Sequence, residues 1–202
     1  MRRASMDFKI LNRESVYQGR AFKVQKVFLE LPNQKQRYYD LVDHNDSVTI
    51  LPIDKNGDVY FVTQYRLGSE SQLLELPAGV IEDNEPPHVC ALREIQEEIG
   101  MAAENLQLLG DFYLVPGYSN EHMYTYLATG LYPSALNPDA DEFLNISRIP
   151  YAQVLEMMRS GKIQDAKSLA TLALALPILG FSSFFICAFF LKLLFFLRYF
   201  PL

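Results

Sequence analysis

The stretch Gly79–Met101, GVIEDNEPPHVCALREIQEEIGM, decides the fold of this chain. Proline in the first turn of a helix loses no backbone hydrogen bond, and a glycine is a common stop after the last turn. Prolines stand at positions 86 and 87 and a glycine at position 100, so we expect a helix over Pro86–Ile99. The apolar positions that would face the core have helical spacing: Val89, Leu92, Ile95 and Ile99.

Three carboxylates in this helix are spaced so that they share one face, which we expect to lie away from the apolar stripe. They are Glu94, Glu97 and Glu98. Like charges at this spacing repel by a few tenths of a kcal/mol per pair. A hard divalent cation is the natural counter-charge for such oxygen ligands, so the sequence predicts a site for Mg²⁺ or Mn²⁺ on this helix.

The whole stretch resembles the Nudix box at every position that the box specifies. Those positions are Gly79, Glu85, Arg93, Glu94, Ile95, Glu97, Glu98, Gly100 and Met101. The resemblance extends from about residue 8 to about residue 176, and it implies an α/β fold. We expect a Nudix-type α/β/α sandwich of mixed β-sheet, with the box helix packed on it, that hydrolyses nucleoside diphosphate derivatives.

The resemblance also implies roles for the residues of the box. Glu94 and Glu98 would be the main metal ligands, together with the carbonyl of Ala78. Glu97 would be a further ligand or a catalytic group. The remaining box residues would be structural: Arg93 paired with Glu85 to hold the loop on the helix, and the two glycines Gly79 and Gly100.

Segments outside the box resemble the ADP-ribose pyrophosphatase branch of the family. They are Leu74–Gly79, Gln64–Arg66 and Pro116–Glu121. This resemblance implies Mg²⁺-dependent hydrolysis of ADP-ribose to AMP and ribose 5-phosphate, with Arg66, Glu82 and Pro116 as substrate-binding candidates. Arg66 ends a predicted strand, where a guanidinium could bind a phosphate, although an ordinary surface charge has the same pattern.

A second acidic segment, Asn137–Glu142, offers the base that the attacking water needs if the box glutamates hold metal. By the resemblance Glu142 is that base, and a solvated acidic loop is the alternative. Other functions also stay open: a pyrophosphatase for UDP-glucose or GDP-mannose, a nucleotide-binding regulator without catalysis, or a membrane-tethered interaction protein.

Alternating residues predict strands on both sides of the box. We expect an N-terminal region, 1–46, with a hairpin within Phe8–Val42, which the resemblance suggests for homodimer formation. A Nudix domain would follow over 47–176, beginning with a hairpin of Ser47–Ile53 and Val59–Gln64. The other predicted elements are strands Leu73–Pro77, Leu106–Leu114, His122–Ala128 and Phe143–Ile149, and helices Tyr151–Ser160 and Asp165–Leu176.

Composition narrows the partners and the compartment. A net charge of −6 argues against a nucleic-acid partner, and the two distant cysteines argue for a reducing compartment, so we expect a cytoplasmic protein. The tail 177–202 differs, because Ser168–Leu191 contains no charged residue. Residues 178–197 fit a membrane anchor, a packed or dimer-covering helix, or a sequence without an evolved role.

Overall fold

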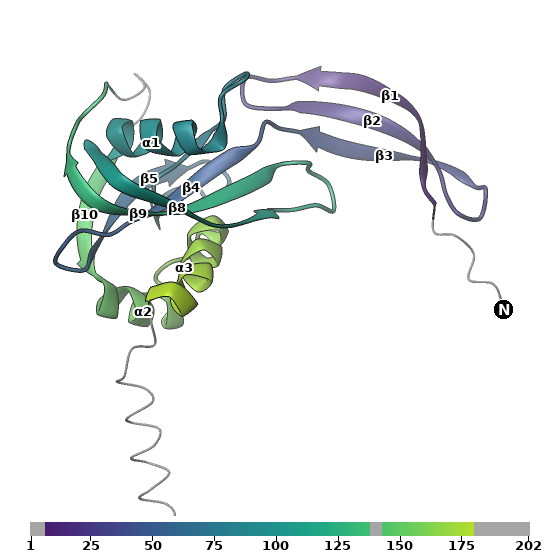
Figure 1. Cartoon of the computed structure of the whole chain (residues 1–202). Coiled ribbons are helices and arrows are strands. Elements are labelled where there is room, and N and C mark those ends of the chain that lie inside the picture. The colour runs from purple at the N-terminus through teal and green to yellow at the C-terminus, as the bar shows by residue number, and fades with distance from the viewer. Residues whose placement is uncertain (1–6, 138–142, 180–202) are drawn as a thin grey trace, which may run out of the picture.

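The computed structural model describes residues 7–137 and 143–179, and in it two β-sheets lie between helices (Figure 1). Helix α1 (Pro87–Glu98) covers one side, and helices α2 (Tyr151–Arg159) and α3 (Ala166–Leu179) cover the other. The expected α/β/α sandwich is therefore confirmed, with the box helix packed on the sheets.

The seven strands that the structure describes in the central region form two sheets. One has the strand order β7-β4-β9-β8, in which β4 and β9 run parallel and the other pairs antiparallel; the other sheet is antiparallel with the order β10-β5-β6. The strands are β4 (Ser47–Pro52), β5 (Asp58–Arg66), β6 (Ser71–Glu75), β7 (Ala78–Val80), β8 (Met101–Tyr113), β9 (His122–Pro133) and β10 (Asn145–Pro150).

Successive residues of a strand point to opposite faces, so the buried strands β4 and β5 supply two cores at once. Val48 and Ile50 pack with α1 residues in one cluster of buried side chains. Leu51 and Phe61 pack with α2 and α3 residues in the other cluster. Each central strand thus stabilises the contact with helices on both of its faces.

The hairpin predicted from Ser47–Ile53 and Val59–Gln64 is wrong. β4 pairs with β7 and β9, whereas β5 pairs with β6 and β10, and only a single bridge, Ile53 to Val59, joins the two segments. A turn does separate the two strands, but the chain leaves one sheet there and enters the other. Strands β8 and β9 are also longer than predicted.

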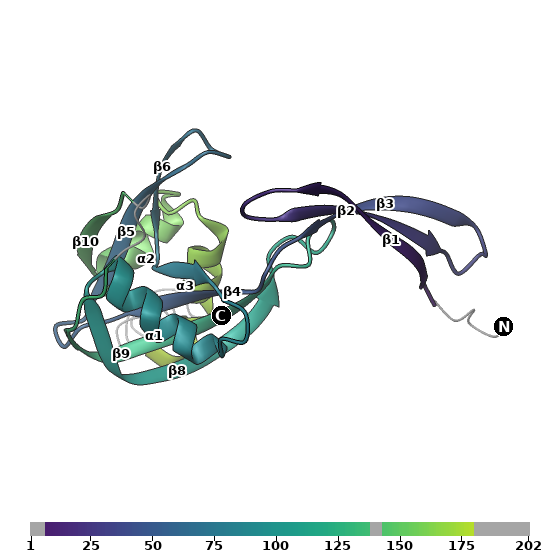
Figure 2. The same ribbon diagram turned by 90° about the horizontal axis from the view of Figure 1, so that it is seen from above.

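The N-terminal segment forms a separate antiparallel sheet that projects from the rest of the molecule (Figure 2). It contains β1 (Lys9–Gln18), β2 (Lys23–Glu30) and β3 (Gln36–Asp43). Apolar side chains are largely exposed on it: Phe8, Ile10, Val16, Tyr17, Tyr38 and Tyr39. The N-terminal sheet therefore carries an exposed apolar surface.

The last helix runs past the end that the sequence predicted. The sequence predicts its end at Leu176, but α3 continues to Leu179 with Pro177 in its last turn. Within residues 7–137 and 143–179, no helix is both long enough and apolar enough to cross a membrane. Most of the predicted span 178–197 lies outside the described residues.

Candidate active site

Helix α1 brings its acidic residues to the inside of the molecule. Pro86 caps the helix, Pro87 is its first residue, and Gly100, with φ of 68°, follows the C-cap in the left-handed region. Two expectations about its faces are wrong. Val89 is exposed, and the carboxylates of Glu94 and Glu98 are buried rather than turned away from the core. The buried stripe combines apolar and acidic positions: Cys90, Ala91, Glu94, Ile95 and Glu98.

Strand β7, which precedes the helix, lies directly on two of these carboxylates. The backbone N–H of Ala78 donates a 3.0 Å hydrogen bond to Glu98 Oε2. At the next residue, a Cβ placed on Gly79 would lie 1.8 Å from Glu94 Oε1. Only glycine therefore allows the strand β7 to approach Glu94 this closely.

Arg93 joins the loop to the helix. Its Nε and Nη2 donate to the two oxygens of Glu85 at 2.9 and 3.0 Å, and Nη2 also donates to the carbonyl of Val80 at 3.3 Å. Its Nη1 donates to Glu94 at 2.7 Å and to Glu97 at 2.8 Å. The pair of Arg93 and Glu85 is present as the resemblance implied, and Arg93 additionally neutralises part of the acidic face.

These contacts set the protonation of Glu85. Hydrogen bonds from Arg93 lower the pKa of Glu85 from its ordinary value of 4.5 to about 2, against the opposing effect of burial. The same bonds, chiefly those to Glu85, raise the pKa of Arg93. Burial, together with the neighbouring charge of Glu94, raises the pKa of the Cys90 thiol, so that this residue stays neutral.

A pH-dependent contribution to stability follows from this pair. Because the folded pKa of Glu85 is depressed, its stabilisation is complete above about pH 5 and disappears as the pH falls from 4.5 towards 2. Glu85→Gln should lower the free energy of unfolding by about 1–2 kcal/mol at pH 7, as expected for a charge-assisted pair. Urea unfolding from pH 7 to pH 3 checks this, with Glu156→Gln on exposed α2 as the control. A deficit that stays constant down to pH 3 would contradict the assignment.

The donor set of the box suits a hard divalent cation. Glu94, Glu97 and Glu98 and the backbone of Ala78 provide oxygen ligands on adjoining elements, and the cradle at Gly79 leaves no room for a side chain between β7 and Glu94. Among the described residues, no three acidic, histidine or cysteine side chains converge closely enough to hold an ion as they stand. Arg93 binds one oxygen of Glu94 and one oxygen of Glu97, so a cation would share these carboxylates with Arg93.

The sequence predicted that the Arg66 guanidinium would be available for a phosphate at the end of a strand. In the structure this guanidinium binds a carboxylate of the protein. Its Nε and Nη2 donate to Glu75 Oε1 and Oε2 at 2.8 and 2.7 Å. Glu75 is 1% exposed, and Lys167 of α3 also donates to its Oε2. Lys167 in turn pairs with Asp165 at 3.0 Å. A buried carboxylate therefore links β5, β6 and α3.

The charges of this cluster keep Glu75 ionised. Burial acts to raise the pKa of Glu75, but the hydrogen bonds from Arg66 and the charge of Lys167 outweigh it, and the pKa is lowered. The bond to Glu75 also raises the pKa of Arg66. Glu75, Asp165 and Lys167 are not among the site residues that the sequence predicted. The one available signal was two charged residues immediately before the long uncharged stretch that begins at Ser168.

Three cavities adjoin one another around Arg66 and Val80, which border all of them. The catalytic cavity, as we call the one of about 370 Å³, also reaches Glu82, Arg93, Glu94 and Glu97. A second cavity, of about 430 Å³, is lined by residues that include His44, Ser47, Glu121, Ala78 and Lys167. The third, of about 650 Å³, lies towards the N-terminal sheet and includes Arg20, Phe22, Lys23 and Gln64.

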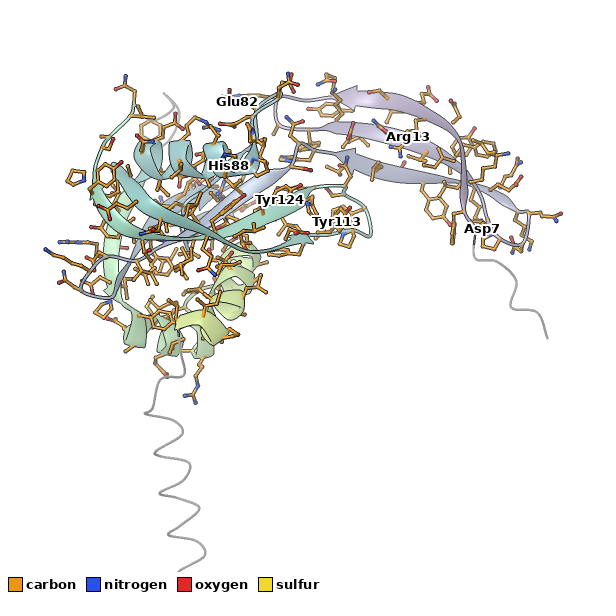
Figure 3. All side chains as sticks on the ribbon, in the orientation of Figure 1. Asp7, Arg13, Glu82, His88, Tyr113 and Tyr124 are labelled. Carbon is orange, nitrogen blue, oxygen red and sulfur yellow. The ribbon has the colours of Figure 1, made fainter. Side chains whose placement is uncertain are left out.

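Of the remaining predicted site residues, only Glu82 borders the catalytic cavity in the part of the chain that the structure describes. Glu82 borders the catalytic cavity, on the loop leading to α1 and on the side from which the N-terminal sheet projects (Figure 3). Pro116 is exposed in the turn between β8 and β9, and its neighbours Leu114 and Val115 line the second cavity in its place. Glu142 lies outside the described residues, so its role as base stays a prediction.

A hydrogen-bonded group that the sequence did not predict lines the second cavity. Ser47 Oγ donates to Glu121 Oε1 at 2.7 Å, and His44 Nδ1 lies 3.8 Å from the same oxygen. Asn120 accepts from the backbone N–H of His44 and donates to Asp43, which ties this wall to the end of β3. The signal in the sequence was the polar run before the strand at His122.

Comparison with known proteins agrees with this geometry. Residues 43–172 match the NUDIX domain family. The ADP-ribose pyrophosphatase of Bacillus subtilis (strain 168) is 32% identical to this chain over 81% of it and 90% of the relative. The methanol dehydrogenase activator of Bacillus methanolicus is 33% identical over 79% of this chain and 88% of the relative. A crystal structure of an ADP compounds hydrolase superposes with a TM-score of 0.76 at 31% identity, covering 83% of this chain and 91% of that one.

Two sheets between helices, with the acidic helix α1 packed against Gly79 of β7, define a hydrolase of the Nudix class. The chain belongs to the Nudix family and is a Nudix hydrolase, because the family match covers residues 43–172 and these relatives cover 81% and 83% of the chain. The expected resemblance to the ADP-ribose pyrophosphatase branch is confirmed by those relatives.

Proposed function

We propose that this protein hydrolyses ADP-ribose to AMP and ribose 5-phosphate by attack of water on the diphosphate. ADP-ribose pyrophosphatases that match 81% and 83% of the chain support this substrate. The single observation that carries the proposal is the position of Arg66. Its guanidinium borders the same cavity as Glu94 and Glu97, so one cavity offers both a cationic group for phosphate and the acidic face of the box.

The arrangement of the cavities fits a substrate with two arms joined by a diphosphate. Because Arg66 borders the catalytic cavity and both neighbouring cavities, a diphosphate there would leave one arm for each neighbour. The third cavity has an aromatic side chain, Phe22, and two cations, Arg20 and Lys23, which suit a nucleotide. Ser47 and Glu121 in the second cavity offer hydrogen-bonding groups for sugar hydroxyls.

A divalent cation completes this proposal, with Mg²⁺ or Mn²⁺ as the ion. Glu94, Glu97 and Glu98 and the carbonyl of Ala78 would hold it. When bound, such an ion neutralises phosphoryl oxygens and lowers the pKa of a bound water. Arg66 would orient the diphosphate, and Arg93 would stay bound to Glu85 and hold the segment before α1 on the helix. Glu142 is the proposed base that takes the proton from water.

We also propose that the projecting sheet β1-β2-β3 pairs with a second copy of the chain. Its exposed apolar side chains, which include Ile10 and Val16 on β1, are the observation that supports a homodimer. The sheet also borders the third cavity through Phe22 and Lys23, so the dimer would help to fix that wall. Sedimentation equilibrium should give twice the chain mass, and a mass of one chain would contradict the dimer.

A panel of nucleoside diphosphate compounds tests the substrate. The compounds are ADP-ribose, UDP-glucose and GDP-mannose, each with Mg²⁺ and then with Mn²⁺, with monophosphate products measured after a phosphatase. ADP-ribose should give the highest kcat/KM. Turnover of another sugar without turnover of ADP-ribose would replace the substrate but keep the reaction, and no turnover of any compound would favour a binding protein without catalysis.

A further inference from the structure

Lys167 lies outside the box and far from it in sequence, yet it reaches the residue that holds Arg66. Its Nζ donates to Glu75 Oε2, the same oxygen that accepts from Arg66 Nη2. Both of these residues are well buried, with side-chain exposures of 11% for Lys167 and 1% for Glu75. Arg66 is the exposed member of the cluster, at 42%. Lys167 and Arg66 therefore share one buried negative charge.

Sharing the carboxylate determines how much positive charge Arg66 presents to a ligand. A buried carboxylate with a single cationic partner neutralises the charge of that partner, because a buried charge without compensation is costly in free energy. Lys167 supplies part of that compensation to Glu75. The guanidinium binds Glu75 through Nε and Nη2, and its Nη1 takes no part in those two bonds. Nη1 is the edge that can face a phosphate at the cavity.

The start of α3 holds this arrangement in place at a second point. Ser168 Oγ accepts a 2.8 Å hydrogen bond from the backbone N–H of Leu76, the residue after Glu75. Asp165 accepts from the backbone N–H of Ser168 and pairs with Lys167. Two contacts in the first turn of α3, from Lys167 to Glu75 and from Ser168 to Leu76, therefore join it to the end of β6, just before the segment Ala78–Val80 that lines the catalytic cavity.

We propose that Lys167 is a positioning residue for substrate binding: by sharing Glu75, it keeps the Arg66 guanidinium turned to the cavity with its charge available to the substrate diphosphate. This inference rests on one part of the proposed function, the binding of the diphosphate by Arg66. Lys167 also borders the second cavity, but the role proposed for it is exerted through Glu75 and not through contact with the substrate. The expected effect is thus on binding rather than on the chemical step.

Lys167→Met tests the proposal, with whichever compound of the panel the wild-type protein hydrolyses best. KM should rise about tenfold, the effect of weakening one charge-assisted contact, while kcat stays within about twofold. A variant that is merely less well folded would lose active molecules, which lowers kcat and leaves KM unchanged. Lys162→Met, at an exposed lysine in the connection between α2 and α3, is the matched control and should keep both constants.

The role of Glu75 is tested by repeating the change in a Glu75→Gln background. Without the shared charge, Lys167→Met should change KM less than about twofold, whatever Glu75→Gln does alone. An equal tenfold rise in both backgrounds would show direct contact with the substrate and overturn the proposal. If Lys167→Met does not give folded protein, as judged by its thermal transition, Lys167→Gln and Lys167→Arg take its place, and the charge-keeping arginine should stay near the wild-type KM.

Arg66→Gln separates failure of this inference from failure of the proposed function. A raised KM in Arg66→Gln together with an unchanged KM in Lys167→Met would overturn the inference alone. An unchanged KM in Arg66→Gln would remove the diphosphate role of Arg66 and the inference with it. A raised KM in both single variants, lost for Lys167 in the Glu75→Gln background, supports the proposal.

Discussion

Glu98→Gln should lower kcat for ADP-ribose about a thousandfold, equivalent to roughly 4 kcal/mol of transition-state stabilisation. The glutamine keeps an oxygen that can accept the hydrogen bond from the Ala78 N–H, so the loop stays on the helix. What the variant loses is the negative charge of a buried ligand candidate. Stability should therefore change by less than about 1 kcal/mol, since the hydrogen bond is retained.

The measurements for this variant are steady-state kinetics and a titration with Mg²⁺. The concentration of Mg²⁺ that gives half-maximal activity should rise along with the fall in kcat. Glu156→Gln removes the same charge from an exposed position on α2 and should match the wild-type protein. Full activity of Glu98→Gln with an unchanged Mg²⁺ requirement would exclude Glu98 as a ligand.

Gly79→Ala should lower kcat at least a hundredfold for a steric reason. The new methyl carbon would lie 1.8 Å from Glu94 Oε1 and 1.9 Å from its Cδ, so either the Glu94 side chain or strand β7 must move. A misplacement of about 1 Å among reacting groups is enough for an effect of this size. Crowding should also lower the free energy of unfolding by about 1–3 kcal/mol.

A second glycine offers the control for this substitution. Nothing lies within 4 Å of a Cβ built on Gly68, in the turn between β5 and β6, so Gly68→Ala should keep wild-type activity. Kinetics and thermal unfolding are compared for the two variants. Wild-type turnover in Gly79→Ala would show that the close approach of β7 to Glu94 is not needed for catalysis.

The sequence predicted local features well because their causes are local. Prolines at the start, a glycine at the end and the carboxylate spacing placed α1 to within a residue at each end. The ion pair of Arg93 with Glu85 came from the family pattern and is present. The alternation along β4 and β5 predicted two strands, and both exist.

What the sequence could not predict depends on contacts between distant segments. β4 pairs with β9, more than seventy residues later in the chain, and nothing in its own alternation distinguishes that partner from β5. The carboxylates of Glu94 and Glu98 are buried because β7 crosses this face of α1, although acidic residues usually face water. The bond from Lys167 to Glu75 joins residues 92 positions apart, so the position of the Arg66 guanidinium could not be predicted from the sequence around it.

The most direct test of the central claim is ³¹P NMR of ADP-ribose incubated with the full-length protein and Mg²⁺ in water enriched with ¹⁸O. The diphosphate signals should be replaced by those of AMP and ribose 5-phosphate in equal amounts, with ¹⁸O in only one of the two products and no reaction after chelation. Persistence of the diphosphate signals in the presence of both Mg²⁺ and Mn²⁺ would contradict the account.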